Sequence, residues 1–393
     1  MARIGIFGGS FNPPHLGHML AVREFMEELT LDRVLIIPAA IPPHKQLSAN
    51  SPDAAARLEM TRLAAQDIEN AEVLDIELKR QGASYTADTV AQLHEQYPTD
   101  ELFLLMGTDM FFSFEKWYHP ERITALCTLA VAHRNADNAQ LLHQCVERLR
   151  EKFGAKVCVI ENDYLPHSST SVRAMLAFGC AESYISPRVM EYIRNHKLYY
   201  VVDDLKNMPF GRLSEVSLSL HAAKRVNHVK GCSQTAMTLA EFYGEDVEAA
   251  GRAGILHDIT KALNAEEQLL LCREYGMILN QFETDNPKLL HAKTGSEVAR
   301  RIFGENELVY RAICWHTTGK EEMTVLEKII YLADYMEPNR DFSGVEELRR
   351  LVYENLDEAM LLGLRMSVEQ LTSRGMQIDP NSLAALRSLE AKL

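Results

Sequence analysis

The stretch from Arg3 to His18 decides the fold of the first half of the chain. It reads Arg3-Ile4-Gly5-Ile6-Phe7-Gly8-Gly9-Ser10-Phe11-Asn12-Pro13-Pro14-His15-Leu16-Gly17-His18. Its first five residues are typical of a buried strand, and the run from Met19 to Leu29 has helical spacing. Glycines directly after a strand let the backbone approach a ligand closely. The stretch therefore predicts a strand, a ligand-binding loop and a helix, in that order.

Further apolar runs alternate with helical stretches over the first half of the chain. The other strand candidates are residues 34–38, 102–106, 129–132 and 157–160. This alternation predicts a doubly wound α/β fold, a Rossmann-like parallel sheet with helices on both faces. In such folds the binding sites lie in the loops that follow the carboxyl ends of the strands.

The pattern changes after about residue 200. From Ser214 onward the apolar residues keep helical spacing and strand signals almost disappear. Pro209 and Gly211 stand together between the periodic segments, as is typical of a linker. We therefore expect an α/β domain at residues 1–203, a linker at 204–213 and an all-α domain at 214–393.

Length and composition fit two globular domains and exclude some partners. The chain has 393 residues, 47% of them hydrophobic, and a formal net charge of −14. An acidic protein does not attract polyanions, so we expect no nucleic-acid partner. No apolar run reaches the roughly 18 to 20 residues of a membrane span. Seven scattered cysteines and the lack of a signal-peptide pattern favour a cytoplasmic protein. The sequence leaves homo-oligomer formation open.

Two motifs in the first half suit phosphate binding. His15 and His18 lie at a helix start, where N–H groups and the helix dipole favour anions. Their imidazoles can donate hydrogen bonds to oxygens that gain charge in a transition state. In the second motif, Ser168-Ser169-Thr170, hydroxyls open a helix and Arg173 follows with a fork that can grip phosphate. The alternatives are a turn with two surface histidines and an ordinary helix cap.

Together these motifs resemble the nucleotidyltransferase superfamily with His-x-Gly-His and Ser-Ser-Thr-x-x-Arg signatures, and within it the bacterial nicotinate-nucleotide adenylyltransferases. Further matching stretches are Pro42-Pro43-His44-Lys45, Ser84–Thr89, Gly107-Thr108-Asp109 with Trp117, and Ile185–Tyr199. The resemblance implies transfer of AMP from ATP to nicotinate mononucleotide with Mg²⁺, releasing pyrophosphate. Two departures are Asn12, where Asp is common, and His167, where an aliphatic residue is usual.

The resemblance also implies roles for matching residues. His15, His18 and Arg173 are the expected catalytic residues. The residues expected to bind ATP or its phosphates are Gly8, Gly9, Ser10, Phe11, Gly107, Asp109, Ser168, Ser169, Thr170 and Arg173. Those expected at nicotinate mononucleotide are Lys45, Thr86 and Trp117. An adenylyltransferase of the same fold that acts on phosphopantetheine is the alternative, although the stretch at Ser84–Thr89 and Trp117 argue against it.

The second half carries an ordered set of metal-ligand residues. They are His228, His257, Asp258, His291, His316 and Asp334. Imidazole and carboxylate are natural ligands of iron, manganese and zinc. Adjacent helical residues point about 100° apart, so His257 and Asp258 can share a metal only at a concave, buried position. Asp334 follows four apolar residues with helical spacing and is expected to point inward, where an unpaired carboxylate is costly. An internal ion pair with Arg or Lys is the alternative.

Residues from about Lys224 to Glu347 resemble the HD superfamily, specifically the helical HD domains that accompany nicotinate-nucleotide adenylyltransferases. That group contains symmetrical bis(5′-nucleosyl)-tetraphosphatases, which implies hydrolysis of diadenosine tetraphosphate to two ADP. In this resemblance His291 and His316 hold a second metal, and Asp258 bridges two ions and is catalytic. We expect iron, with manganese as the alternative.

Other residues and functions of this half follow from the same resemblance. Lys261, Thr317 and Arg340 are candidate substrate contacts, with Asp341 as a weaker one. His221 has no assigned role and is expected to be exposed or to cap a helix. The alternatives for this half are hydrolysis of another nucleotide, such as a guanosine alarmone or a nucleoside monophosphate, and a non-catalytic nucleotide-sensing module that regulates the first half.

Overall fold

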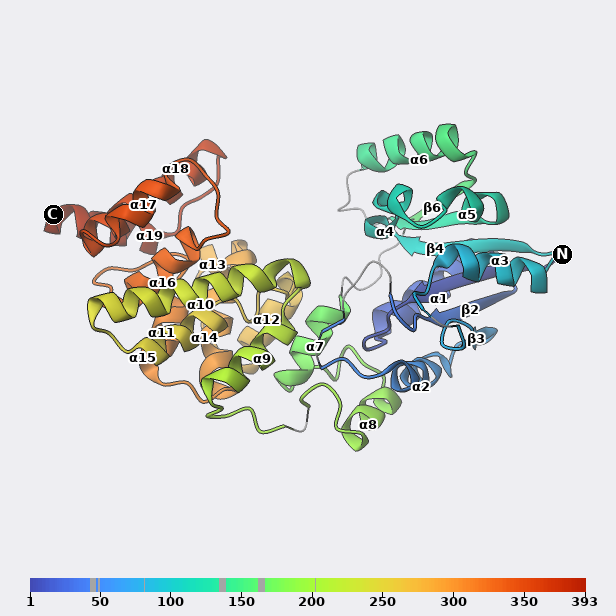
Figure 1. Cartoon of the computed structure of the whole chain (residues 1–393), viewed down its shortest axis with the longest axis horizontal. Coiled ribbons are helices and arrows are strands. Elements are labelled where there is room, and N and C mark those ends of the chain that lie inside the picture. The colour runs from blue at the N-terminus through green and yellow to red at the C-terminus, as the bar shows by residue number, and fades with distance from the viewer. Residues whose placement is uncertain (43–46, 49, 81, 134–138, 162–166, 202) are drawn as a thin grey trace. The chain divides into compact units, whose positions relative to one another are not determined.

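The computed structural model describes residues 1–42, 47–48, 50–80, 82–133, 139–161, 167–201 and 203–393. The chain forms two compact units, Met1–Val202 and Asp203–Leu393 (Figure 1). No helix in the described ranges is long and apolar enough to cross a membrane.

The first unit contains a parallel sheet. Its strands are β1 (Arg3–Gly9), β2 (Arg33–Pro38), β3 (Ala71–Val73), β4 (Glu101–Gly107), β5 (Thr128–His133) and β6 (Val157–Glu161). They are ordered β3-β2-β1-β4-β5-β6, and every neighbouring pair is parallel. In the central register Ile4 lies between Arg33 of β2 and Leu102 of β4. The predicted doubly wound α/β fold is therefore confirmed.

Helices cover both faces of this sheet (Figure 1). The helices of the unit are α1 (Leu16–Glu28), α2 (Ala54–Ala65), α3 (Thr86–Gln96), α4 (Thr108–Phe112), the 3₁₀ helix η1 (Phe114–Lys116), α5 (Pro120–Leu126), α6 (Ala139–Phe153), α7 (Ser169–Ala177) and α8 (Pro187–Asn195), and α1, α2, α3, α5 and α6 pack on the sheet. Successive strand residues point to opposite faces. Leu104 accordingly packs in one core with side chains of α3, α5 and α6, while Leu105 packs in the other with α1 and α2.

The strand order places a candidate site at the centre of the sheet. The chain runs outward on one side from β1 to β2 and β3, and on the other side from β4 to β5 and β6. The order therefore reverses between β1 and β4, and ligands bind doubly wound sheets at the carboxyl ends of such strands. Those ends carry Gly8-Gly9 and Gly107.

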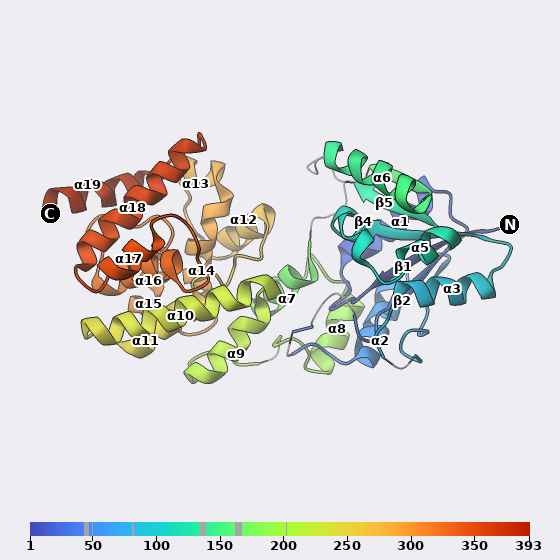
Figure 2. The same cartoon turned by 45° about the horizontal axis from the view of Figure 1, so that its top comes forward.

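The second unit consists of helices joined by turns and loops and has no strand among its described residues, as predicted (Figure 2). Its helices are α9 (Phe210–Leu220), α10 (Ala223–Tyr243), α11 (Val247–Leu256), α12 (Ala265–Glu274), α13 (Gln281–Asp285), the 3₁₀ helix η2 (Pro287–Leu289), α14 (Leu290–Arg301), α15 (Glu307–Cys314), α16 (Val325–Met336), α17 (Val345–Leu351), α18 (Leu356–Ser373) and α19 (Pro380–Lys392). Residues 210–213, which we expected in a linker, already belong to α9. Helix α10 packs against α11 and α16, and α14 packs against α15.

Candidate active sites

The loop after β1 leads directly into the paired histidines of the first site. His15 is buried at the N-cap of α1, and its backbone N–H donates to His18 Nδ1 over 3.2 Å. The two rings lie 3.6 Å apart between centroids. Because Nδ1 of His18 accepts, neutral His18 carries its proton on Nε2. That N–H is the group that can donate to a phosphate oxygen.

Helix α7 brings the serine-rich motif against the same loop. The Ser168 side chain caps α7 by accepting from the Ser171 N–H. Ser169 Oγ donates to the Pro13 carbonyl over 3.3 Å, and Arg173 Nη1 donates to the Asn12 carbonyl over 2.8 Å. These contacts join two motifs that lie more than 150 residues apart in sequence. The structure therefore unites the two phosphate motifs.

Arg173 is buried where the two motifs meet. Its Nη2 donates to Thr170 Oγ1 over 3.3 Å, while its Nε has no hydrogen-bond partner among the described residues. Burial lowers the pKa of Arg173 from its ordinary 12.5. An arginine stays protonated at neutral pH even so. The arrangement thus keeps a buried positive charge beneath the loop, which favours an anion there.

A second buried arginine, Arg57 of α2, was not predicted. Its guanidinium donates to the carbonyls of Ser10, Ala39 and Ala40 at 2.7, 2.8 and 2.9 Å. It therefore ties the loop after β1 to the loop after β2. Burial lowers the pKa of Arg57 as well. Nothing in the sequence separates Arg57 from an ordinary surface arginine on a helix.

The two departures from the family pattern both have structural partners. Asn12 is buried, accepts from the Tyr199 hydroxyl over 2.7 Å and donates to Ser51 Oγ over 2.7 Å. An amide can do both, whereas a carboxylate only accepts. His167 places its ring edge against Tyr184, with centroids 4.4 Å apart.

The residues expected at nicotinate mononucleotide lie on other elements. Thr86 is the first residue of α3, whose N-cap Tyr85 offers no side-chain hydrogen bond. Trp117 follows η1 and packs on Phe114, with ring centroids 5.2 Å apart. Asp109 is exposed in the first turn of α4, directly after Gly107. Lys45 lies outside the described residues.

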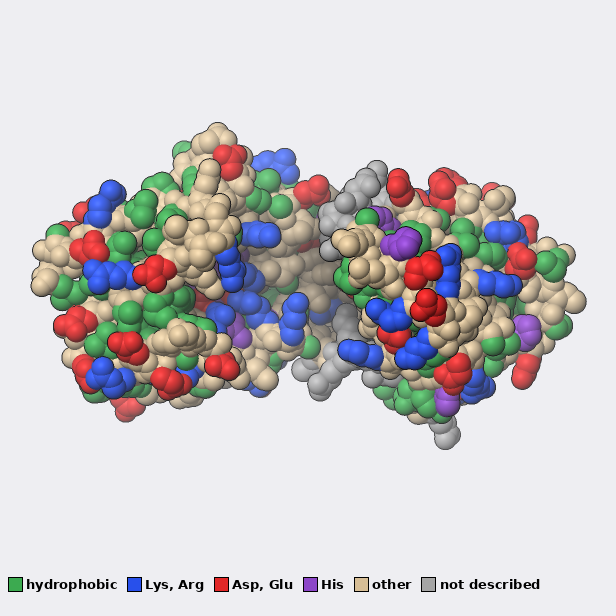
Figure 3. Space-filling view, turned by 90° about the horizontal axis from the view of Figure 1, so that it is seen from above, with side chains coloured by type: hydrophobic (Ala, Val, Ile, Leu, Met, Phe, Trp, Pro, Cys, Tyr) green, Lys and Arg blue, Asp and Glu red, His purple; other side chains and the backbone are tan. Residues whose placement is uncertain are grey.

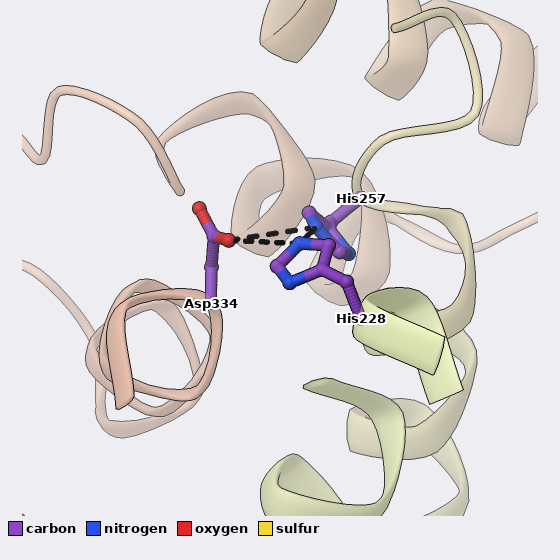
Figure 4. A group of neighbouring side chains, drawn as sticks. All are labelled: His228, His257 and Asp334. Carbon is purple, nitrogen blue, oxygen red and sulfur yellow. Dashed lines mark hydrogen bonds and ion pairs between the residues drawn. The ribbon is translucent and has the colours of Figure 1, made fainter. Parts of the chain in front are cut away.

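In the second unit all six expected metal ligands converge. His228 lies on α10, Asp334 on α16, and His257 directly after α11 (Figure 4). His228 Nε2 is 3.1 Å from Asp334 Oδ1 and 3.3 Å from His257 Nε2. His228, His257 and Asp334 form one group that could hold an ion, and His257, Asp258 and His316 form a second.

The two oxygens of Asp258 face opposite sides of the cluster. Oδ2 lies 3.3 Å from His257 Nε2 and 3.7 Å from His228 Nε2. Oδ1 lies 3.3 Å from His291 Nε2 and 3.8 Å from His316 Nε2. Asp258 is 1% exposed, and its Oδ1 has no hydrogen-bond partner among the described residues. This carboxylate is therefore placed to join two cation positions.

Each histidine is oriented by a bond to its other ring nitrogen. Nδ1 of His257, His291 and His316 bonds the carbonyl three residues earlier, at 2.8, 2.7 and 2.7 Å. Nδ1 of His228 instead bonds Glu337 Oε1 at 3.1 Å. A carbonyl can only accept, so the proton sits on Nδ1 and the Nε2 lone pair points into the cluster. Metal-binding histidines show this arrangement, and the residues present therefore fit divalent metal ions.

The electrostatics differ between the residues of the cluster. Burial would lower the pKa of His228 and His257, but Asp258 and other neighbours raise it overall, so these two rings take up a proton more readily than a free imidazole does. Asp258 and His291 have the protonation states of metal ligands. Burial would raise the pKa of Asp258, but His257, His228 and His316 hold it well below 3.8. Burial and the Lys261 cation lower the pKa of His291 to about 3, so this ring is neutral at physiological pH. A neutral imidazole beside an ionised carboxylate is the protonation state that binds a metal.

Basic side chains surround the cluster. Lys261 Nζ is 2.8 Å from His291 Nε2, and Arg340 Nη2 donates to Asp334 Oδ1 over 2.8 Å. Thr317 Oγ1 lies 3.2 Å from His316 Nε2. In Figure 3, Lys and Arg side chains gather on one face of the helical unit, with a histidine among them. Asp334 thus makes both contacts considered from the sequence: it faces His228 and also pairs with Arg340.

Comparison with known proteins identifies the protein family of the first half of the chain. A cytidylyltransferase-like family model matches residues 6–175, and an HD domain model matches residues 225–339. A protein of Geobacter sulfurreducens named as a probable nicotinate-nucleotide adenylyltransferase is 37% identical over 212 residues, covering 50% of this chain and 98% of that protein. The chain belongs to the nicotinate-nucleotide adenylyltransferase family. It is an enzyme, and its second half is an HD phosphohydrolase domain.

Two further relatives of this adenylyltransferase carry names that include a hydrolase. A Mycoplasma genitalium protein, named as a probable nicotinate-nucleotide adenylyltransferase/Ap4A hydrolase, is 27% identical and covers 92% of this chain and 97% of its own length. A Clostridium acetobutylicum crystal structure, described as a predicted HD superfamily hydrolase involved in NAD metabolism, is 35% identical, with a TM-score of 0.46 and coverage of 47% of this chain and 99% of that one.

Three residues beside the HD cluster of this adenylyltransferase were missed or misplaced by sequence reasoning. Arg225, one turn before His228, pairs with Asp258. Glu337 is 1% exposed and orients His228. His221 ends α9, as a capping residue would, but it is buried rather than exposed, and burial lowers its pKa to about 3. No sequence signal marked Arg225, because its partner Asp258 lies 33 residues further along the chain.

Proposed function

We propose that the first unit transfers AMP from ATP to nicotinate mononucleotide, and that the second hydrolyses diadenosine tetraphosphate to two ADP. The observation that carries the first activity is the union of His15, His18 and the Ser168–Arg173 motif at the switch point of the sheet. The observation that carries the second is the Asp258 carboxylate between two pairs of imidazole nitrogens.

In the first reaction a phosphate oxygen of nicotinate mononucleotide attacks the α-phosphorus of ATP, supplied as its Mg²⁺ complex. The bond to the β-phosphate breaks and pyrophosphate leaves. His18 Nε2–H donates to an α-phosphate oxygen as charge develops, with His15 beside it. The hydroxyls and N–H groups at the start of α7, with Arg173, bind the leaving phosphates. In-line positioning and charge stabilisation accelerate the step without a covalent enzyme intermediate.

The acceptor and the nucleoside occupy the surrounding elements. The uncapped start of α3 at Thr86 supplies backbone N–H donors for the nicotinate carboxylate. Trp117 stacks on the pyridine ring, and Lys45 contacts the acceptor phosphate. Gly107 and Asp109 lie at the end of β4, where Asp109 binds the nucleotide ribose.

In the second unit His228, His257, Asp258 and Asp334 would hold one divalent ion, and Asp258 with His291 and His316 would hold another. Iron or manganese suits such a mixed set of nitrogen and oxygen ligands. Ions held by these residues would supply an activated water molecule and would neutralise phosphate charge at neutral pH. Lys261, Arg340 and Thr317 line the cluster and bind the remaining phosphate oxygens.

Product analysis tests both proposals. With ATP and nicotinate mononucleotide the protein should form deamido-NAD and pyrophosphate in equal amounts. With diadenosine tetraphosphate, after anaerobic loading with Fe²⁺ or Mn²⁺, it should form ADP alone. Products ATP and AMP would contradict symmetrical cleavage. Hydrolysis of a guanosine alarmone or a nucleoside monophosphate in preference would identify another nucleotide as substrate, and tight binding without hydrolysis would indicate a sensing module.

A further inference from the structure

A cavity of about 560 Å³ opens beside the metal-ligand cluster of the second unit. One wall is formed by Tyr335, Arg340 and Phe342, at the end of α16 and in the segment after it. The opposite wall is one face of α18, where Glu369, Gln370 and Ser373 recur at helical spacing. Helix α18 packs against α16 and α17, as Figures 1 and 2 show. The volume lies within the usual range for small-ligand sites.

Arg340 connects this cavity to the metal-ligand cluster. Its Nη2 donates to Asp334 Oδ1 over 2.8 Å and its Nε to the Asp334 carbonyl over 2.9 Å, while the same side chain lines the cavity. Tyr335, on the cavity wall, follows Asp334 directly in sequence. Arg340 is therefore shared by the cluster and the cavity, and a ligand whose phosphate is bound by Arg340 can place its adjoining nucleoside against the cavity wall.

The cavity has the chemistry of a nucleobase site. The rings of Tyr335 and Phe342 meet edge to face, with centroids 5.1 Å apart, and both remain partly exposed. Aromatic faces stack on bases of any sequence. Gln370 can both donate to and accept from the edge of a base, and the Glu369 carboxylate can accept from an exocyclic amine.

Charge fixes the orientation of such a ligand. The Arg340 guanidinium lies on the side of the cluster, and the Glu369 carboxylate lies on α18. Phosphates are attracted to the first and repelled by the second. The phosphates should therefore point to the cluster and the base to α18.

We propose that this cavity binds the purine base at one nucleoside end of the polyphosphate hydrolysed at the cluster. The proposal rests on the proposed hydrolase function and adds a base-binding subsite to it. A nucleoside polyphosphate should therefore bind more tightly than inorganic polyphosphate, since each stacked base adds affinity that phosphate alone lacks.

The kinetic test uses the full metal-loaded chain, three cavity variants and one control variant. Phe342→Ala and Gln370→Ala should raise KM for diadenosine tetraphosphate, the first by about 5- to 100-fold, with kcat nearly unchanged. The inhibition constant of inorganic pyrophosphate should stay the same, because pyrophosphate has no base. Phe342→Leu, which keeps bulk without an aromatic face, should resemble Phe342→Ala. Gln234→Ala, an exposed glutamine of α10 outside the cavity, is the control.

Photolabelling separates failure of the subsite from failure of the proposed hydrolase. 8-Azido-ADP bound to the full chain should label peptides that contain residues 335–343 or 366–373, and excess ADP should prevent it. If these peptides were labelled but diadenosine tetraphosphate was not hydrolysed, the base site would be supported and its assigned substrate would be wrong. Hydrolysis with unchanged KM in the folded variants, and labels elsewhere in residues 203–393, would overturn the base site.

Discussion

A single methyl group at Gly231 should weaken metal binding in the second unit. Gly231 lies on α10, three residues after His228, and a Cβ built there would stand 2.3 Å from Glu337 Oε2. Ordinary van der Waals contact begins at 3.4 Å, so the carboxylate must move by about 1 Å. Glu337 is held by two bonds from Asn339, and its Oε1 bonds His228 Nδ1 at 3.1 Å. A shift of that size takes the last bond beyond hydrogen-bonding distance.

The expected magnitude follows from the role of Glu337. Loss of a group that orients a metal-binding histidine typically costs about 10- to 100-fold in metal affinity, which is about 1.4 to 2.7 kcal/mol. Gly231→Ala should therefore raise the dissociation constant for Mn²⁺ by that factor. Helix propensity acts the other way, because Ala is favoured over Gly inside a helix by about 1 kcal/mol. The expected result is therefore weaker Mn²⁺ binding together with an unchanged or higher melting temperature. This combination distinguishes the loss of a ligand-orienting group from general destabilisation of the fold.

Titration calorimetry of the metal-free protein with Mn²⁺ measures this change. Gly211→Ala is a matched control, since Gly211 lies on α9 and a Cβ there meets nothing within 4 Å. Glu337→Gln keeps the volume but removes the charge and should weaken binding less than Gly231→Ala. Unchanged Mn²⁺ affinity in Gly231→Ala would refute the assignment of Glu337 as the group that orients His228.

Three further predictions concern substrate choice, metal content and acid stability. Nicotinate mononucleotide should exceed nicotinamide mononucleotide in kcat/KM by more than about 10-fold, because a neutral amide replaces a carboxylate poorly at N–H donors; equal efficiency in steady-state kinetics would contradict this. Elemental analysis of metal-replete protein should give about two ions per chain, and His291→Ala about one; a single ion in the unaltered protein would refute the two-ion site. Burial would raise the pKa of Asp357, but ion pairs with Lys328 and Lys392 lower it overall. The stabilisation of the fold by ionised Asp357 is therefore present above the unfolded pKa of about 4. It is lost as the pH falls through the lower pKa of the folded state. Asp357→Asn should therefore lower the melting temperature at pH 7 and leave it unchanged at about pH 2; an equal loss at both would contradict the ion-pair explanation.

Local sequence patterns predicted the central strands and the loop after β1, because burial of both sheet faces produces continuous apolar runs. The same signal missed β3 (Ala71–Val73), whose three residues are half-buried or exposed and show no such run. It also assigned residues 210–213 to a linker because Pro209 and Gly211 are typical of loops. Pro is tolerated at the start of a helix, and the buried face of α9 begins at Leu213.

The six candidate metal ligands could be singled out from the sequence because histidine and aspartate have few structural reasons to be buried together, and the structure brings all six into one cluster. The residues that position them could not be singled out in this way. Glu337 and Arg225 belong to residue types that cover most protein surfaces, and only the fold shows that one is buried against His228 and the other pairs with Asp258. Arg57 could not be predicted from the sequence either, since its three carbonyl partners come from loops that lie apart in sequence.

The central claim is that each unit contains a complete and separate active site. The most direct test measures both activities in each of two variants, one altered in each site. Asp258→Ala should reduce hydrolysis of diadenosine tetraphosphate by orders of magnitude, since it removes the carboxylate between the two cation positions, and should leave adenylylation of nicotinate mononucleotide nearly unchanged. His18→Ala should do the reverse, with circular dichroism confirming that both variants are folded. Loss of adenylylation in folded Asp258→Ala would contradict separate sites.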